Sequence, residues 1–201
     1  MLAVVWLILC SVCSTMLILA CGVRVAPCRC TLPLHAAIQV MLVGLCLPFH
    51  AIHFAPESAT SVGLFDIACV LTCAGAIVLG YYADTQLRDF MVANHQRPKA
   101  DKVHVLDSGV WRFSRHPNYF AEQAWWWSLG LLGARLGWWW VLAGTAFNSI
   151  VMARVTVLTE KRMEANVARR VAWREYKART SMWVPWFEKE GELVPAKLHE
   201  H

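Results

Sequence analysis

The chain has 201 residues, of which 57% are apolar and 16% are charged, and its net charge is +5. A soluble globular domain is about 45–50% apolar and 25% charged, so this composition favours a membrane protein. It disfavours a disordered chain, a coiled coil and a soluble Rossmann-type enzyme. Eleven tryptophans strengthen the interpretation, because indole rings concentrate at bilayer interfaces.

Four apolar stretches reach the length of roughly 20 residues that a helix needs to cross a bilayer. A fifth is shorter and polar in places, and the glycine-containing segment after it is typical of a turn, which predicts a helical hairpin over residues 119–158. The sequence therefore predicts an all-α, polytopic membrane protein with about five transmembrane helices, the fourth short, tilted or partly re-entrant. The predicted spans are Met1–Gly22, Leu34–Ala55, Val62–Ala83, Tyr119–Leu132 and Trp138–Leu158.

The positive charges predict the orientation of these spans. With five spans, all but Arg135 and Arg154 of the 19 Lys and Arg residues fall in three segments on the same side of the membrane. By the positive-inside rule that side is the cytosol, and the N-terminus faces away from it. The charged segment after Thr159 is amphipathic, and we expect it to lie along the cytosolic face.

Polar residues with chemical potential gather at the start of the fourth span. Pro117 suits the first position of a helix, so a helix N-terminus would lie beside Arg115 and His116, an arrangement typical of an anion-binding site. Arg115, Asn118 and Glu122 follow the i, i+3, i+7 spacing of one helix face. A carboxylate inside an apolar span is costly unless it is paired. We expect a functional site here, not only charges that set the topology.

This segment, GVWRFSRHPNYFAE from Gly109 to Glu122, closely resembles the signature of membrane proteins with a steroid 5-alpha-reductase C-terminal domain. The related isoprenylcysteine carboxyl methyltransferases share its Arg-His-Pro core. Two further blocks resemble the reductase group: ADTQLRDF over Ala83–Phe90, and a C-terminal block with Glu160-Lys161-Arg162, Glu175-Tyr176, Arg179 and Pro185. The resemblance covers about Pro33 to Phe187. It divides the chain into an N-terminal helix and loop (1–32), a steroid-reductase-like membrane domain (33–187) and a polar tail (188–201).

The resemblance implies a membrane-embedded reductase that binds NADPH on its cytosolic side. Its reaction would reduce a carbon–carbon double bond in a steroid, sterol or related lipid, in the endoplasmic reticulum or another endomembrane. Arginine suits such a cofactor, because its guanidinium holds phosphate groups bidentately. The residues that match the family's cofactor contacts are Asp84, Arg88, Arg115, His116, Asn118, Tyr119, Glu122, Tyr176 and Arg179.

Two other functions stay open. The Arg-His-Pro core also occurs in methyltransferases that bind S-adenosylmethionine, so methyl transfer is the first alternative. The second is a truncated or non-catalytic cofactor-binding membrane protein. It arises because the steroid reductases position and protonate their substrate with a carboxylate and a tyrosine from further N-terminal helices. Neither residue has a counterpart here, so no catalytic residue is assigned.

The expected partners are the lipid bilayer and a lipophilic small molecule. Nucleic acid is not expected, because the basic residues follow membrane topology and form no single stripe. No metal site is predicted, since Cys10 and Cys13 have no second pair of ligands nearby. Asp84 and Arg88 could also form an ordinary i, i+4 salt bridge at a helix end. The substrate and the oligomeric state stay undefined at this point.

Overall fold

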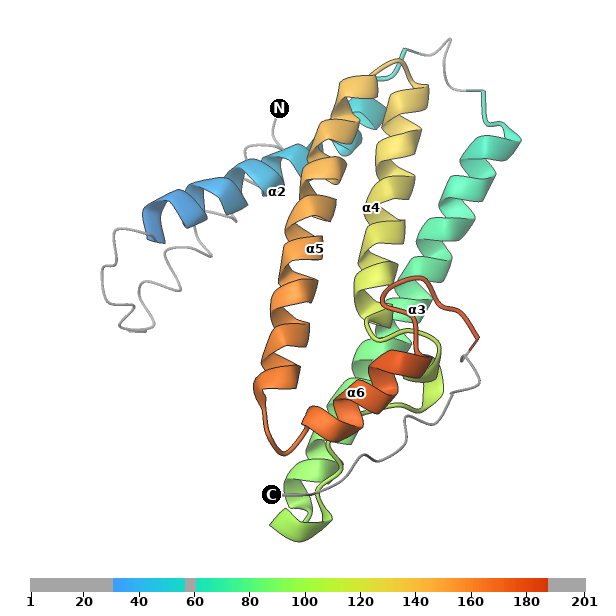
Figure 1. The fold of residues 1–201 in the computed structure, drawn as a ribbon. Helices are drawn as coiled ribbons and strands as arrows, with labels where there is room; N and C mark the ends of the chain where they lie inside the picture. Colours follow the sequence, from blue (N-terminus) through green and yellow to red (C-terminus); the bar gives the residue numbers. More distant parts are fainter. Residues whose placement is uncertain (1–30, 57–60, 188–201) are drawn as a thin grey trace. The chain divides into compact units, whose positions relative to one another are not determined.

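The computed structural model describes residues 31–56 and 61–187. All regular elements within these ranges are helical, as predicted. The predicted first span and the polar tail after residue 187 lie outside the described residues. The five α-helices (Figure 1) are α2 (Thr31–His53), α3 (Leu64–Gln96), α4 (Pro117–Arg135), α5 (Leu142–Ala165) and α6 (Arg170–Arg179).

The chain forms two compact units. Among the described residues, one unit combines those between Thr31 and Asp66 with Leu129–Ser149, and therefore contains α2, the end of α4 and the start of α5. The other combines Ile67–Ser128 with residues 150–187. It contains nearly all of α3, the start of α4, the end of α5, and α6. All the sequence-predicted site residues lie in this second unit.

In the first unit, a tight turn joins α4 to α5. Gly137 has a φ of 93°, in the left-handed region that glycine adopts without strain. Its amide donates to the carbonyl of Ala134 at 3.0 Å, and the amide of Trp138 donates to that of Gly133 at 3.3 Å. The turn thus lies where the glycine-containing segment predicted it. The start of α5 is delayed to Leu142 by an intervening 3-10 turn.

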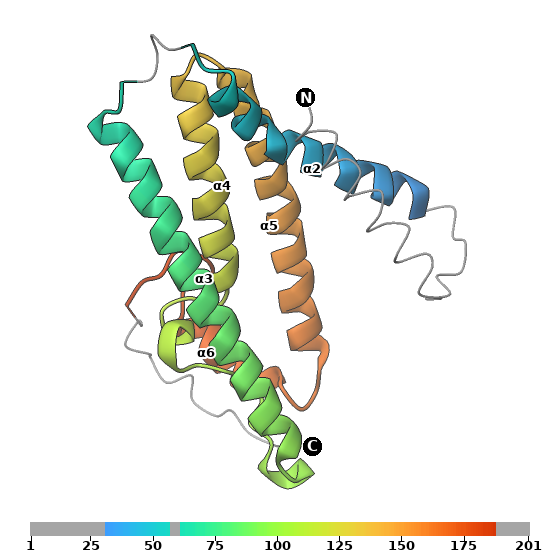
Figure 2. The same cartoon turned by 180° about the vertical axis from the view of Figure 1, so that it is seen from behind.

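Helices α2 and α5 approach each other closely at two glycines, Gly44 and Gly144 (Figure 2). A Cβ atom added to Gly144 would lie 2.3 Å from the carbonyl carbon and oxygen of Gly44. Real Cβ contacts are never that short, so the two backbones meet where neither carries a side chain. Small residues at helix crossings allow this approach in membranes.

Helix α3 extends well past the predicted end of its span at Ala83 and continues to Gln96. The sequence turns polar after Ala83, which ends the hydropathy signal without ending the helix. In the last turns of the helix, the amide side chain of Asn94 pairs with the backbone of Val103 in the loop that follows. Its Nδ2 donates to the Val103 carbonyl at 2.8 Å and its Oδ1 accepts from the Val103 amide at 2.9 Å. This pairing folds the following loop back along α3.

Two helical segments of the described chain are long and apolar enough to cross a membrane, Leu64–Gln96 and Trp139–Ala165. Large apolar side chains point outward along the first of them, including Val70, Leu71 and Ile77, each more than half exposed. Contiguous apolar surface of this kind marks contact with a membrane or a partner. These features support a membrane protein.

Candidate functional site

The loop before α4 is fastened to α3 by side chains from two of the motif blocks. The amide of Val110 donates to Gln86 Oε1 at 3.0 Å, and Trp111 Nε1 donates to the carbonyl of Ala83 at 3.1 Å. Gly109 has a φ of 62°, and a Cβ there would lie 2.3 Å from Gln86 Oε1. This close contact therefore explains why a glycine stands at Gly109, opposite the side chain of Gln86, in two different motif blocks.

Residues 180–186, which we name the C-terminal strap, run beside the start of α4. The backbone amides of Arg115 and His116 donate to the carbonyls of Ser181 and Met182 at 2.8 and 3.1 Å. Both residues precede Pro117, the first residue of α4, so the strap covers the segment that leads into the helix.

A buried carboxylate, Glu160 near the end of α5, lies at the centre of the charged groups. Its Oε1 accepts from Arg115 Nε at 2.9 Å and lies 3.3 Å from His116 Nε2, and its Oε2 lies 3.3 Å from Lys177 Nζ. The side chains of Arg115 and Glu160 are 7% and 6% exposed, whereas that of Lys177 is 39% exposed. We name these four residues the Glu160 cluster: Arg115, His116, Glu160 and Lys177. Buried charges are tolerated when they are paired in this way.

The same arginine also binds the end of α6. Arg115 Nη1 donates to the carbonyls of Lys177 and Thr180, at 3.1 and 2.5 Å. Carbonyls at a helix C-terminus lack partners within the helix and carry partial negative charge, so a guanidinium suits them. Arg115 thereby links the start of α4, the end of α5 and the end of α6.

Tyr176 makes a parallel link from α6 to the loop before α4. Its hydroxyl donates to the carbonyl of Trp111 at 2.5 Å and lies 3.1 Å from the carbonyl of Ser114. Its side chain is only 2% exposed. Figure 1 shows α6 and the strap lying beside the start of α4, as these bonds require. Arg115, His116 and Tyr176 therefore hold this part of the unit together.

Burial and pairing set the protonation states around the cluster. Burial lowers the pKa of His116, and the nearby Glu160 carboxylate opposes only part of that effect. His116 is therefore neutral at pH 7 and offers a ring N–H to Glu160. The hydrogen bond to Glu164 (2.8 Å) raises the pKa of Lys177, with a further contribution from Glu160, so Lys177 stays charged.

A second group of predicted contacts lies on the surface of the unit. Asn118 Nδ2 donates to Asp84 Oδ1 at 3.2 Å, which brings the start of α4 to α3. The ring of Tyr119 stacks on that of His116, with centroids 5.0 Å apart and planes 12° from parallel. Glu122 is exposed, as is Asp84. A ligand can therefore reach Asp84 and Glu122, which are exposed, more easily than Asn118 and Tyr119, which are half-buried.

Two predicted arginines pair with acids that are not among the predicted cofactor contacts. Arg88 binds its neighbour Asp89 at 3.0 Å, and both side chains are largely exposed, so the simple pairing of Arg88 with Asp84 is not observed. Arg179 forms an ion pair with Asp107. Both pairs are solvent-accessible and contribute little to stability.

The expectation that Arg115, Asn118 and Glu122 share a helix face is wrong for Arg115. Helix α4 begins at Pro117, so Arg115 precedes it, and its side chain is buried whereas Glu122 is exposed. The intramembrane-carboxylate argument also selected Glu122 when the buried, triply paired carboxylate is Glu160. The sequence analysis named Glu160 only as a member of the C-terminal block, and its position at the end of an apolar span was the signal for a role.

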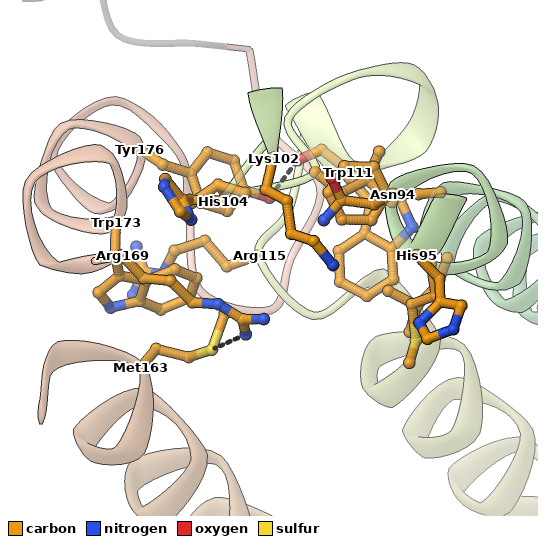
Figure 3. Close-up of a pocket in the computed structure, with 15 residues that line it drawn as sticks. Asn94, His95, Lys102, His104, Trp111, Arg115, Met163, Arg169, Trp173 and Tyr176 are labelled. Atoms are coloured by element: carbon orange, nitrogen blue, oxygen red, sulfur yellow. Dashed lines mark hydrogen bonds between the residues drawn. The ribbon is translucent and has the colours of Figure 1, made fainter. Parts of the chain in front are cut away.

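A cavity of about 320 Å³ lies next to the Glu160 cluster (Figure 3). Its walls come from the last turns of α3, the loop around residues 102–106, Trp111 and α6. Buried aromatic residues line it, and so do Lys102 and Arg169. Arg115 is part of the wall as well. The cavity is therefore an aromatic-walled space with basic side chains, adjacent to residues of the motif.

A protein family described as a protein of unknown function (DUF1295) matches residues 24–180, and the chain belongs to that family. The match covers every described helix. No curated protein and no solved structure matches the chain.

Proposed function

We propose that this member of the DUF1295 family is an integral membrane reductase that uses NADPH to reduce a carbon–carbon double bond in a steroid, sterol or related lipid. One observation carries the proposal. The three blocks that resemble the reductase signature contact one another directly, through Gln86 and Val110, Arg115 and Glu160, and the Tyr176 hydroxyl. Residues that serve one site must converge, and motif residues separated by as many as 65 positions do so here.

The side chains present fit a dinucleotide phosphate. No acidic residue occurs among the described residues that line the cavity, whereas Lys102 and Arg169 do, and Glu160 already neutralises Arg115 in the wall. Guanidinium and ammonium groups bind phosphate. NADPH, when bound, supplies the hydride, and the protein's part is binding, orientation and exclusion of water.

Within this proposal the predicted residues divide into two sets. Asp84, Asn118, Tyr119 and Glu122 contact the cofactor, because their carboxylate, amide and phenol groups suit hydroxyl and carboxamide partners. Arg115, His116 and Tyr176 are positioning residues, because their polar atoms bind Glu160 or backbone carbonyls. Arg88 and Arg179 remain predicted contacts whose acidic partners a phosphate would displace.

The proposed topology has five membrane spans, with the cofactor side in the cytosol and the protein in the endoplasmic reticulum or another endomembrane. The basic side chains around the Glu160 cluster support this orientation under the positive-inside rule. The substrate is lipophilic and reaches the site from the bilayer. The proton donor is not assigned.

The test is calorimetric titration of the purified full-length protein in detergent with NADPH, NADH and S-adenosylmethionine. We expect saturable NADPH binding that Asn118→Ala and Asp84→Asn weaken and that Lys161→Met leaves unchanged, since Lys161 is exposed and does not line the cavity. Binding of S-adenosylmethionine alone would replace the proposal with methyl transfer. Binding of NADPH with no oxidation on addition of sterol enones would favour a non-catalytic protein.

A further inference from the structure

The cavity beside the Glu160 cluster is too small for a whole dinucleotide. At about 320 Å³ it lies at the lower end of the range of roughly 300–1,000 Å³ for small-molecule sites. A ligand the size of one nucleoside with a phosphate fits such a volume. The rest of a longer ligand would have to leave through the opening.

Aromatic side chains make up much of the wall. Trp111, Trp173 and Tyr176 are all buried, with at most 8% exposed, and Phe90 joins them from α3. Aromatic rings favour flat, conjugated ligands, and stacking of a nucleobase on such a ring contributes about 1–3 kcal/mol. The indole N–H of Trp173 is buried without an acceptor among the described residues. A buried donor in that state indicates a missing partner.

The basic side chains are available to an anion. In Figure 3, Lys102 and Arg169 reach into the space between the rings of Trp111 and Trp173. Within residues 31–56 and 61–187, neither has an acidic partner, and the hydrogen bond of Arg169 goes to the sulfur of Met163 at 3.6 Å, a weak acceptor. Arg115 differs, because Glu160 neutralises it. Lys102 and Arg169 therefore supply the uncompensated positive charge of the cavity.

We propose that this cavity binds a phosphorylated adenosine, the end of NADPH that carries the 2′-phosphate, and that Lys102 and Arg169 select that phosphate. The inference rests on the proposed function for the identity of the complete ligand. Neither residue belongs to the motif blocks, so the assignment comes from the cavity alone. It predicts a preference for NADPH over NADH, which lacks the phosphate.

The experiment measures the binding of adenosine 2′,5′-bisphosphate, adenosine and inorganic phosphate to the full-length protein in detergent, alongside NADPH and NADH. The bisphosphate should bind more tightly than either fragment. Lys102→Met and Arg169→Met should each weaken it by about tenfold to a hundredfold, the effect of one charge-assisted hydrogen bond. Lys161→Met, the matched control, should leave it unchanged.

Each other outcome is decisive. Inorganic phosphate binding as tightly as the bisphosphate would overturn the inference, because the aromatic wall would then contribute nothing. An affinity for NADPH that neither substitution changes would overturn the inference and leave the proposed function intact. Bisphosphate binding that depends on both residues, in a protein that oxidises no NADPH with any lipid, would support the inference and refute the reductase.

Discussion

Glu160→Gln tests whether the Glu160 cluster holds α4, α5 and α6 together. The substitution keeps the size of the side chain and removes its charge. Arg115 would then be a buried cation without a counter-charge, although its bonds to the carbonyls of Lys177 and Thr180 remain. We expect the variant to be folded and clearly less stable than the wild type.

The magnitude follows from the exposure of each partner. Breaking a buried ion pair by removing one member costs about 3–5 kcal/mol, and the two remaining carbonyl bonds favour the lower figure of about 3 kcal/mol. The contact with Lys177 adds little, because that side chain is 39% exposed and exposed pairs contribute about 0–1 kcal/mol. For a chain of this length, about 3 kcal/mol lowers the midpoint of thermal unfolding by about 6–12 °C.

The assay is thermal unfolding of the detergent-purified protein, followed by tryptophan fluorescence, with Lys177→Met as the control. The double variant Arg115→Met/Glu160→Leu completes the comparison. It should recover much of the loss, because apolar replacement of both members leaves no unpaired charge. If Glu160→Gln and Lys177→Met shift the midpoint equally little, the cluster does not hold the helices as argued.

Three further predictions concern the backbone and pH. Gly144→Ala should lower the free energy of unfolding by about 1–3 kcal/mol, because its Cβ would meet the Gly44 carbonyl. Gly109→Ala should cost about 1–2 kcal/mol, because alanine is strained at its φ of 62°. Both are measured by thermal unfolding. The pKa of His116 is lowered from 6.5 in the fold, so the unfolded chain binds a proton that the folded chain does not. Stability should therefore fall as the pH drops below about 6.5, and His116→Gln should flatten that dependence.

The controls for these predictions come from the same chain. Gly75→Ala lies within α3 with no atom near its would-be Cβ, so it should stabilise the helix by about 0.5–1 kcal/mol. Gly137→Ala has a positive φ and open space around it, so it isolates the backbone strain from the contact with Gln86. An unfolding midpoint that is level from pH 7 to about pH 5 in the wild type would contradict a neutral, buried His116.

Helix starts and turns were predictable where one residue type has a strong local preference. Pro117 marks the first residue of α4, and Gly137 marks the turn before α5. The end of α3 was not predictable from hydropathy, because the helix leaves the apolar zone and continues through polar residues to Gln96. Its last turns are held by Asn94 and Val103, a pairing that depends on where the loop returns.

The sequence predicted which residues belong to the site better than it predicted what each of them does. The motif blocks named Arg115 and Tyr176, and both are central to the site. Their partners are backbone carbonyls and Glu160, between 45 and 65 residues away. Backbone acceptors leave no trace in the sequence, since any residue supplies a carbonyl. The strap is bound largely through its carbonyls, so its sequence did not indicate that it lies beside the loop before α4.

The order of synthesis gives the strap a further significance. Arg115 is made 45 residues before Glu160 and 65 residues before Thr180, so its guanidinium lacks these native partners while α4 and α5 are being completed. Assembly of this region can finish only when the residues of the strap have been translated. A chain interrupted after α5 would lack α6 and the strap, so Arg115 and Glu160 would be left without the backbone carbonyls and the lysine that complete the cluster.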